Sequence, residues 1–253
     1  MARDNATSTP EAPAVTRTRA KPLLASAAIV LALGVAAMIW HADSHSAPGA
    51  ISTTHGADGV QTVELAGFNG KVTVGVNGSQ IVATAQPANG DVGPGLEFHL
   101  DDTTHVLTLA CYDQHTGKGP IACPATEYKV SVPAGMGVKL QLLNGQATLS
   151  DLSGPVSITA NSAYALAQNL KTNDFTATIT SGTLNATFAT PPTHVAVTVD
   201  SAQAALHLPG TVTYDVQQQT TSAYVQVSIP QAADATHSVQ ANANSGEISL
   251  LAN

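Results

Sequence analysis

Polar and apolar residues alternate along most of the chain after residue 60. Successive side chains of a β-strand point to opposite faces, so this period-two pattern predicts strands that are buried on one face. The first runs are separated by Asn, Gly, Pro and Asp, which favour turns. They predict an antiparallel meander with strands at residues 60–67, 71–76, 80–86, 95–102 and 105–112.

A repeat emerges in the second half when the turn residues are aligned. Each unit carries two alternating runs, as at residues 174–180 and 183–189, and a loop at residues 230–236 accounts for the longest unit. A period near 20 residues with two strands per unit is typical of a β-solenoid or stacked β-sheet. An antiparallel sandwich with evenly spaced turns is the alternative. The aligned turn pairs are Asn144-Gly145, Asn161-Ser162, Ser181-Gly182, Ser201-Ala202, Thr221-Ser222 and Ser245-Gly246.

An uncharged apolar segment occupies residues 23–40. At about 1.5 Å rise per residue, a helix of this length spans roughly 27 Å, close to the roughly 30 Å hydrocarbon core of a bilayer. Basic residues precede the segment and none follows it directly, so the positive-inside rule places residues 1–22 in the cytoplasm and the rest outside. A cleaved signal peptide is the alternative interpretation, and it exports the remainder equally.

The remainder divides by composition. Residues 41–59 are small, polar and aperiodic, which predicts a flexible tether. Residues 60–253 then form the exported β-repeat domain, divisible into lobes at 60–135 and 136–253. The predicted fold class is therefore all-β: a repeat β-solenoid or stacked β-sheet domain preceded by one transmembrane helix.

Charge narrows the range of partners. The chain is 43% hydrophobic but only 10% charged, with a net charge of −8. After residue 40 it holds five Lys, no Arg and fifteen Asp or Glu. Nucleic-acid binding rests on clustered Lys and Arg, so we exclude a nucleic-acid partner.

The two cysteines, Cys111 and Cys123, both lie in the exported part. The eleven residues between them include Gly117, Gly119 and Pro120, which suit a hairpin tip. Closing such a loop stabilises a fold by about 3 kcal/mol in the chain-entropy model. We therefore predict a structural disulfide, because two cysteines without a CxxC spacing supply too few ligands for a metal.

Several segments carry a family resemblance. Residues 129–158 contain a VPAG turn and an Asn-Gly turn, residues 244–250 read NSGEISL, and a cysteine-bounded loop precedes YKVSVPAG. This combination resembles the bacterial putative-adhesin family of exported β-repeat domains, whose function is mostly unassigned. The resemblance covers roughly residues 60–253, and it implies fold and location more than activity. The family's Ser-Gly-Asp or Asn-Gly-Asp turns are degraded here at residues 161–163, 201–203 and 221–223.

Candidate catalytic and metal-binding residues are weak. His41, Asp43 and His45 lie close together in the predicted tether, which lacks the preorganisation of a metal site. A second group lies at a predicted hairpin tip, where a solvated turn is the simpler interpretation: His99, Asp101, Asp102 and His105. No GxSxG motif or calcium-binding nonapeptide occurs. The carboxylates of the repeat region are scattered singly and are not paired on one face as in polysaccharide-cleaving solenoids: Asp151, Asp174, Asp200, Asp215 and Asp234. We predict no enzyme activity, no metal and no cofactor.

These patterns predict a single-pass protein of the cell membrane, anchored by residues 23–40, with a cytoplasmic N-terminus and an extracellular β-domain. Its predicted role is that of a non-catalytic adhesin or surface interaction module, with a surface glycan, a cell-wall polymer or a protein as partner. A sensory or regulatory ectodomain is the alternative.

Overall fold

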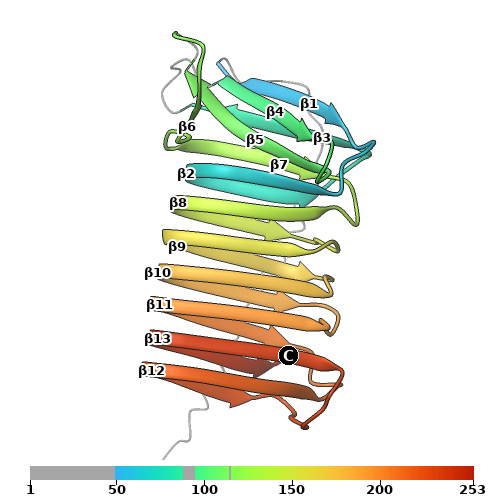
Figure 1. The fold of residues 1–253 in the computed structure, drawn as a ribbon, viewed down its shortest axis with the longest axis vertical. Coiled ribbons are helices and arrows are strands. Elements are labelled where there is room, and N and C mark those ends of the chain that lie inside the picture. Colours follow the sequence, from blue (N-terminus) through green and yellow to red (C-terminus); the bar gives the residue numbers. More distant parts are fainter. Residues whose placement is uncertain (1–48, 88–94, 114) are drawn as a thin grey trace, which may run out of the picture. The chain divides into compact units, whose positions relative to one another are not determined.

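The computed structural model describes residues 49–87, 95–113 and 115–253 (Figure 1). The all-β prediction is confirmed, since the described residues form thirteen strands in one sheet. The strands are β1 Ile51–Gly56, β2 Thr62–Val76, β3 Gln80–Gln86, β4 Gly95–Asp101, β5 Val106–Asp113, β6 Lys118–Ile121, β7 Thr126–Val132, β8 Gly137–Ser150, β9 Val156–Leu170, β10 Asp174–Phe188, β11 His194–Leu208, β12 Tyr214–Ser228 and β13 His237–Ala252.

The long strands stack as the rungs of a coil. From β2 onward the order is β2, β8, β9, β10, β11, β13 and β12, and every neighbouring pair is parallel (Figure 1). Each rung places its inward side chains directly above those of the next rung. One such buried column runs through Leu140, Ile158, Ala177, Val197 and Ala241. The core is therefore a narrow pile of Leu, Ile, Val and Ala, shared between neighbouring rungs.

Each rung has two arms that meet at a corner. In β10, buried positions are odd-numbered from 175 to 179 and even-numbered from 184 to 188. The alternation therefore changes phase at Ser181 and Gly182, where the chain turns while the strand pairing continues. In the equivalent positions of the other rungs, Ser162, Ser201 and Ser245 align with Ser181.

Two of the turn pairs predicted from the sequence are wrong by one residue. Asn144 pairs with Ser162 and Gly145 with Ala163, so the β9 corner lies one residue later than Asn161-Ser162. The β12 corner is likewise Ser222-Ala223, because those residues pair with Ser245 and Gly246 of β13. Both errors arise where small polar residues adjoin without a glycine to mark the turn.

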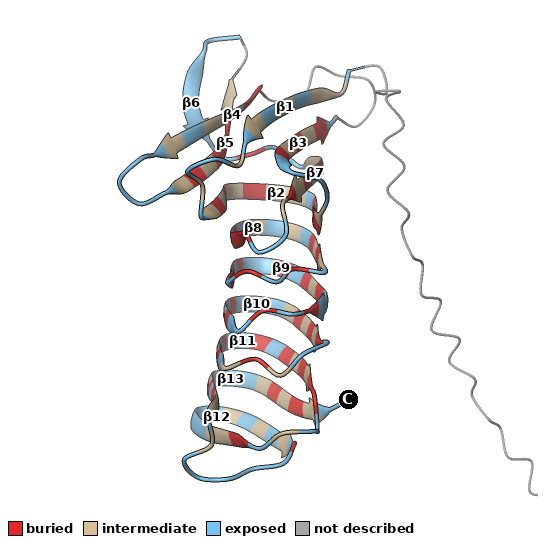
Figure 2. Cartoon of the chain, turned by 90° about the vertical axis from the view of Figure 1, so that its right-hand side faces the viewer, coloured by how far each residue is buried: buried red, intermediate tan, exposed pale blue. Residues whose placement is uncertain are grey.

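The last two rungs are out of sequence order. β13 lies between β11 and β12 and is parallel to both, so the rung formed by β12 ends the stack (Figure 2). The loop at residues 230–236 is present, but it leads the chain back into the gap between β11 and β12 instead of lengthening a regular repeat.

The first part of the domain mixes strand directions. β1, β3 and β7 are antiparallel neighbours, as are β4, β5 and β6. However, β2 is parallel to β5, β7 and β8, and it joins the two runs predicted at residues 60–67 and 71–76. The antiparallel meander is therefore wrong for β2, because alternation identifies a strand but not the direction of its neighbours.

The β-structure begins earlier than expected. β1 falls inside residues 41–59, where the sequence predicted a tether, and pairs in register with β3. Ile51 and Thr53 are half-buried there, which the polar composition of the segment concealed. Between residues 49 and 253, the described residues form one compact unit with a continuous apolar core that includes residues of both predicted lobes.

The predicted cytoplasmic tail at residues 1–22 and the apolar segment at residues 23–40 lie outside the described residues. Within the described ranges, no helix is long and apolar enough to span a bilayer.

Candidate functional site

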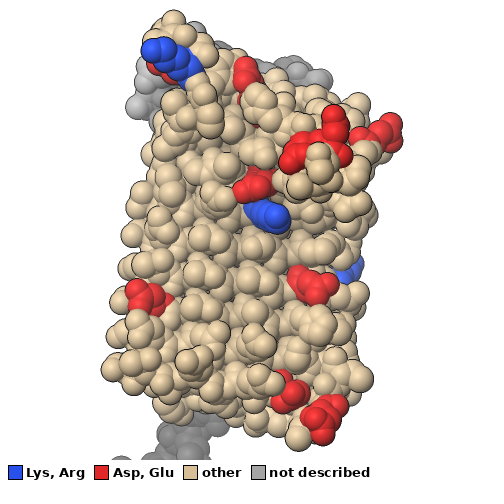
Figure 3. All heavy atoms as spheres, viewed as in Figure 1, with Lys and Arg blue, Asp and Glu red and all other residues tan. Residues whose placement is uncertain are grey.

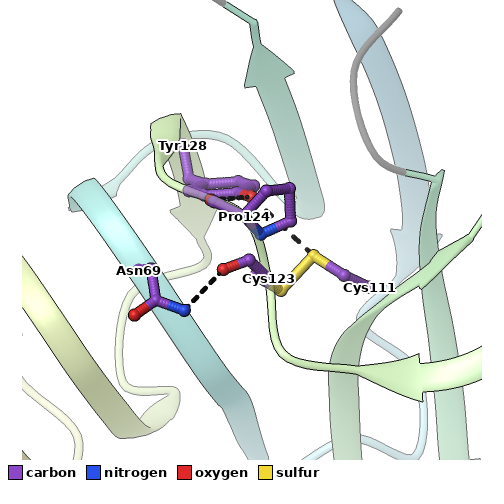
Figure 4. Close-up of a disulfide and its surroundings, with 5 residues drawn as sticks. All are labelled: Asn69, Cys111, Cys123, Pro124 and Tyr128. Carbon is purple, nitrogen blue, oxygen red and sulfur yellow. Dashed lines mark hydrogen bonds between the residues drawn. A yellow bond between two sulfur atoms is a disulfide. The ribbon is translucent and has the colours of Figure 1, made fainter.

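The predicted disulfide is present. Cys111, near the end of β5, is bonded to Cys123, just after β6, with their Cα atoms 5.1 Å apart (Figure 4). Both cysteines are buried beside Tyr128, whose hydroxyl donates to the carbonyl oxygen of Pro124 at 2.7 Å. Asn69 Nδ2 donates to Cys123 O at 2.7 Å, which ties the β5–β6 hairpin to β2. The bond is therefore structural and inaccessible to substrates.

The histidines near the β4–β5 hairpin have separate partners. His99 Nε2 lies 3.2 Å from a Glu97 carboxylate oxygen, whereas His105 Nδ1 lies 3.0 Å from Gly59 O. The Asp101 carboxylate accepts hydrogen bonds from the backbone N–H groups of Thr103 and Thr104. Hydrogen bonds from the Thr104 side chain and these backbone groups lower the pKa of Asp101. This turn is held by its own hydrogen bonds.

Within the described ranges, no three His, Cys, Asp or Glu side chains gather as a metal site would require. The group formed by His41, Asp43 and His45 lies outside the described residues.

Uncharged polar side chains form a continuous column on the first arm of the rungs. Thr178 of β10 pairs with Thr159 of β9 on one side and with Thr198 of β11 on the other, and all three point outward. Adjacent strands lie about 4.8 Å apart, so the hydroxyls repeat at roughly that interval. We call this set the polar column. Its members, in spatial order, are Gln141, Thr159, Thr178, Thr198, Asn242 and Gln219.

An open groove of about 420 Å³ follows the stacked corners and borders the second arm. Tyr164, 43% exposed, stands in it between Gln146 of β8 and Thr183 of β10, with which it is in register. We call this the corner groove. It is lined by Gly145, Gln146, Ser162, Ala163, Tyr164, Ser181, Gly182 and Thr183.

Backbone packing makes the groove shallow and smooth. Gly182 has a φ of 120°, and a Cβ atom there would lie 2.0 Å from the carbonyl oxygen of Ala163. Gly145 and Gly246 meet the corner of a neighbouring rung in the same way. Since only glycine adopts such a backbone without strain, these residues let successive corners approach closely and leave backbone exposed beside Tyr164.

Electrostatics distinguish these surfaces from an ionic binding site. Neither the polar column nor the corner groove includes a charged side chain, and the one carboxylate bonded to a column member is that of Glu64, which accepts from Gln141 Nε2 at 2.7 Å within the described residues. On the face shown in Figure 3, charged side chains are few and wide areas between them carry none. At the edge of the first arm, the Asp200 carboxylate accepts a hydrogen bond from Asn244 Nδ2 at 2.6 Å. The arrangement suits hydrogen bonding to a neutral ligand.

Neither surface was predicted from the sequence. Membership of the polar column depends on the register of the rungs and on the exchanged order of β12 and β13, which the sequence pattern did not predict. The Thr-x-Thr pattern of Thr176, Thr178 and Thr180 was the available signal.

No family model matches the chain, and no curated protein matches it. Among solved structures, it is similar to a putative cell adhesion protein from Clostridium sporogenes, at 13% identity and a TM-score of 0.49, over 82% of this chain and 100% of the other. It is also similar to a putative adhesin from Bacteroides fragilis, at 9% identity and a TM-score of 0.38, over 81% of this chain and 98% of the other. A third similar structure is a putative lipid binding protein from Parabacteroides distasonis, at 7% identity and a TM-score of 0.32, over 79% of this chain and 96% of the other.

These similar solved structures include putative adhesins, the kind of protein that the sequence resembles. These identities and TM-scores are too low to assign a ligand or an activity.

Proposed function

We propose that this protein is a non-catalytic, adhesin-type module that binds a neutral, hydroxyl-rich polymer, such as a surface glycan or cell-wall polysaccharide, along the side of its rung stack. The polar column carries this proposal. A polymer presents the same hydrogen-bond donors and acceptors at regular intervals. The polar column offers hydroxyl and amide groups that repeat once per rung and can bond to them.

The corner groove supports the same ligand class. The ring of Tyr164 is an exposed apolar surface with a polar hydroxyl, flanked by the amide of Gln146 and the hydroxyl of Thr183. Aromatic rings bordered by hydrogen-bonding groups suit ligands that are apolar on one face and polar at the edge, as sugar rings are. A rigid stack also orders these groups before binding, which lowers the entropic cost of association.

The proposal places the β-domain outside the cell, anchored by residues 23–40 as a membrane helix. The Cys111–Cys123 disulfide supports this location, because such bonds persist in oxidising compartments. Protease treatment of intact cells that express a C-terminally tagged chain tests the topology. We expect loss of the tag; a tag that stays protected until the cells are lysed contradicts the proposed location.

Binding is tested by co-sedimentation of the protein with purified cell-wall and surface polysaccharides at low and high salt. Because the proposed surfaces are uncharged, we expect the bound fraction to change little as salt increases, whereas ionic contacts weaken. Binding only to charged polymers, with release by salt, would show that another surface is responsible. Absence of binding to every neutral polymer would refute the proposed ligand class.

A further inference from the structure

The end of the stack exposes a strand edge. Within the described residues, β12 pairs with β13 and with no other strand, apart from a single bridge between Tyr214 and Gln231. In that bridge Tyr214 N donates to Pro230 O at 3.0 Å, and Ala232 N donates to Tyr214 O at 3.1 Å. The chain therefore covers the first residue of this edge itself, and the edge from residue 215 to residue 228 is open.

The open edge also exposes the end of the core. Val216, Val225 and Val227 occupy inward positions but are only half-buried, because no further rung covers them (Figure 2). Gln218 takes the inward position where the preceding rung has Ala241, and it is exposed. An open strand edge with half-covered valines is a template for another strand.

We propose that β12 is a self-association surface, on which the β12 strand of a second copy of this chain pairs antiparallel about a two-fold axis between Thr221 and Ser222. Such an axis bisects the corner and exchanges the two arms. It sets Val216 opposite the partner's Val227, and Thr220 opposite the partner's Ala223. Inward side chains thus face inward side chains across the whole junction, so the two cores become continuous.

The charge pattern favours a second copy as the occupant. Asp215 is the only charged residue of β12, and the two-fold pairing sets it opposite Ser228 of the other chain. No like charges therefore meet. The pairing also leaves the Tyr214 bridge in place, because it begins at residue 215.

The size of the contact predicts a weak dimer. Fourteen residues at about 3.3 Å each give an edge of roughly 46 Å, and a layer about 10 Å deep gives about 900 Å² buried over both copies. This is slightly below the roughly 1,000 Å² of a stable specific interface. We therefore expect reversible, concentration-dependent association.

Two paired variants test the register. The pairing sets Gln217 opposite the partner's Gln226, twice per dimer, with both side chains outward. The variant Gln217→Lys/Gln226→Lys places like charges opposite each other, and we expect it to weaken association roughly tenfold. The variant Gln217→Lys/Gln226→Glu places opposite charges there, and we expect it to associate at least as tightly as the wild type. Gln168→Lys/Gln203→Lys is the control, because it adds the same charge on the sides of the stack.

The measurement is sedimentation of the full-length chain in mild detergent, from micromolar to millimolar concentration. The expected result is dimerisation of the wild type, the Lys/Glu variant and the control, with the Lys/Lys variant shifted to higher concentration. A wild type that stays monomeric throughout overturns the proposal. So does a Lys/Lys variant that matches the wild type, or a Lys/Glu variant as weak as Lys/Lys.

Discussion

The substitution Gly182→Ala tests whether the stack depends on close contact between corners. Gly182 is a corner residue of β10 with a φ of 120°, and a Cβ atom added there would lie 2.0 Å from the carbonyl oxygen of Ala163. That oxygen belongs to the backbone of the neighbouring rung, which is held by pairing on both sides. The clash therefore cannot be relieved by rotating a side chain.

Two costs add. A non-glycine residue in this region of backbone conformation costs about 1–3 kcal/mol, and forcing an extra carbon into a packed contact costs about another 1–3 kcal/mol. We expect Gly182→Ala to lower the free energy of unfolding by about 2–6 kcal/mol. Ala202→Gly is the matched control, because Ala202 holds the equivalent corner position in the next rung. We expect that change to cost only about 1 kcal/mol.

The assay is urea unfolding of residues 43–253, followed by circular dichroism, since this unit has its own apolar core. A loss below about 1 kcal/mol for Gly182→Ala, or a larger loss for Ala202→Gly, would refute the account of the corner.

Two further predictions concern stability. Replacing Cys111 and Cys123 with Ala should lower the free energy of unfolding in urea by about 3 kcal/mol, because the unfolded chain regains the freedom of the closed loop; an unchanged unfolding midpoint would contradict this. Burial raises the pKa of Tyr214 to about 12, so the unfolded state loses this proton first and stability should fall as pH rises from about 10 towards 12. In urea unfolding at several pH values, Tyr214→Phe should flatten part of this decline, because burial raises the pKa of Tyr128 as well; an equally steep decline would show that Tyr214 does not contribute.

The sequence predicted the fold class and most corners, because both depend on local pattern. Ser181-Gly182 and Ser245-Gly246 mark corners by a small polar residue followed by a glycine that the backbone requires. At Ser162-Ala163 the glycine is absent, and two overlapping dipeptides, Asn161-Ser162 and Ser162-Ala163, fit equally well. The predicted position of this corner was therefore one residue too early.

Rung order could not be predicted, because β12 and β13 alternate in the same way. One signal was available. Inward positions of β13 carry Val239, Ala241 and Ala243, whereas the matching positions of β12 include Gln218 and Thr220. Polar side chains at inward positions indicate a terminal rung, since a central rung would have to bury them.

The proposed binding surface also depends on the register of the strands. The alternating pattern does not say which polar residues of different strands become neighbours. Only the pairing of β9, β10 and β11 places Thr159, Thr178 and Thr198 in one column. The disulfide, in contrast, was predictable because two cysteines in a segment that the sequence predicts to be exported leave one pairing.

The most direct test of the proposed function is the affinity of a neutral polysaccharide, identified by co-sedimentation, for the triple variant Thr159→Ala/Thr178→Ala/Thr198→Ala. At about 0.5–1.5 kcal/mol for each of three hydrogen bonds, we expect affinity to fall roughly 10-fold to 2,000-fold. The control replaces outward threonines of the second arm, Thr73, Thr148 and Thr187, and should bind like the wild type. Equal affinity of the triple variant and the wild type would contradict the assignment of binding to the polar column.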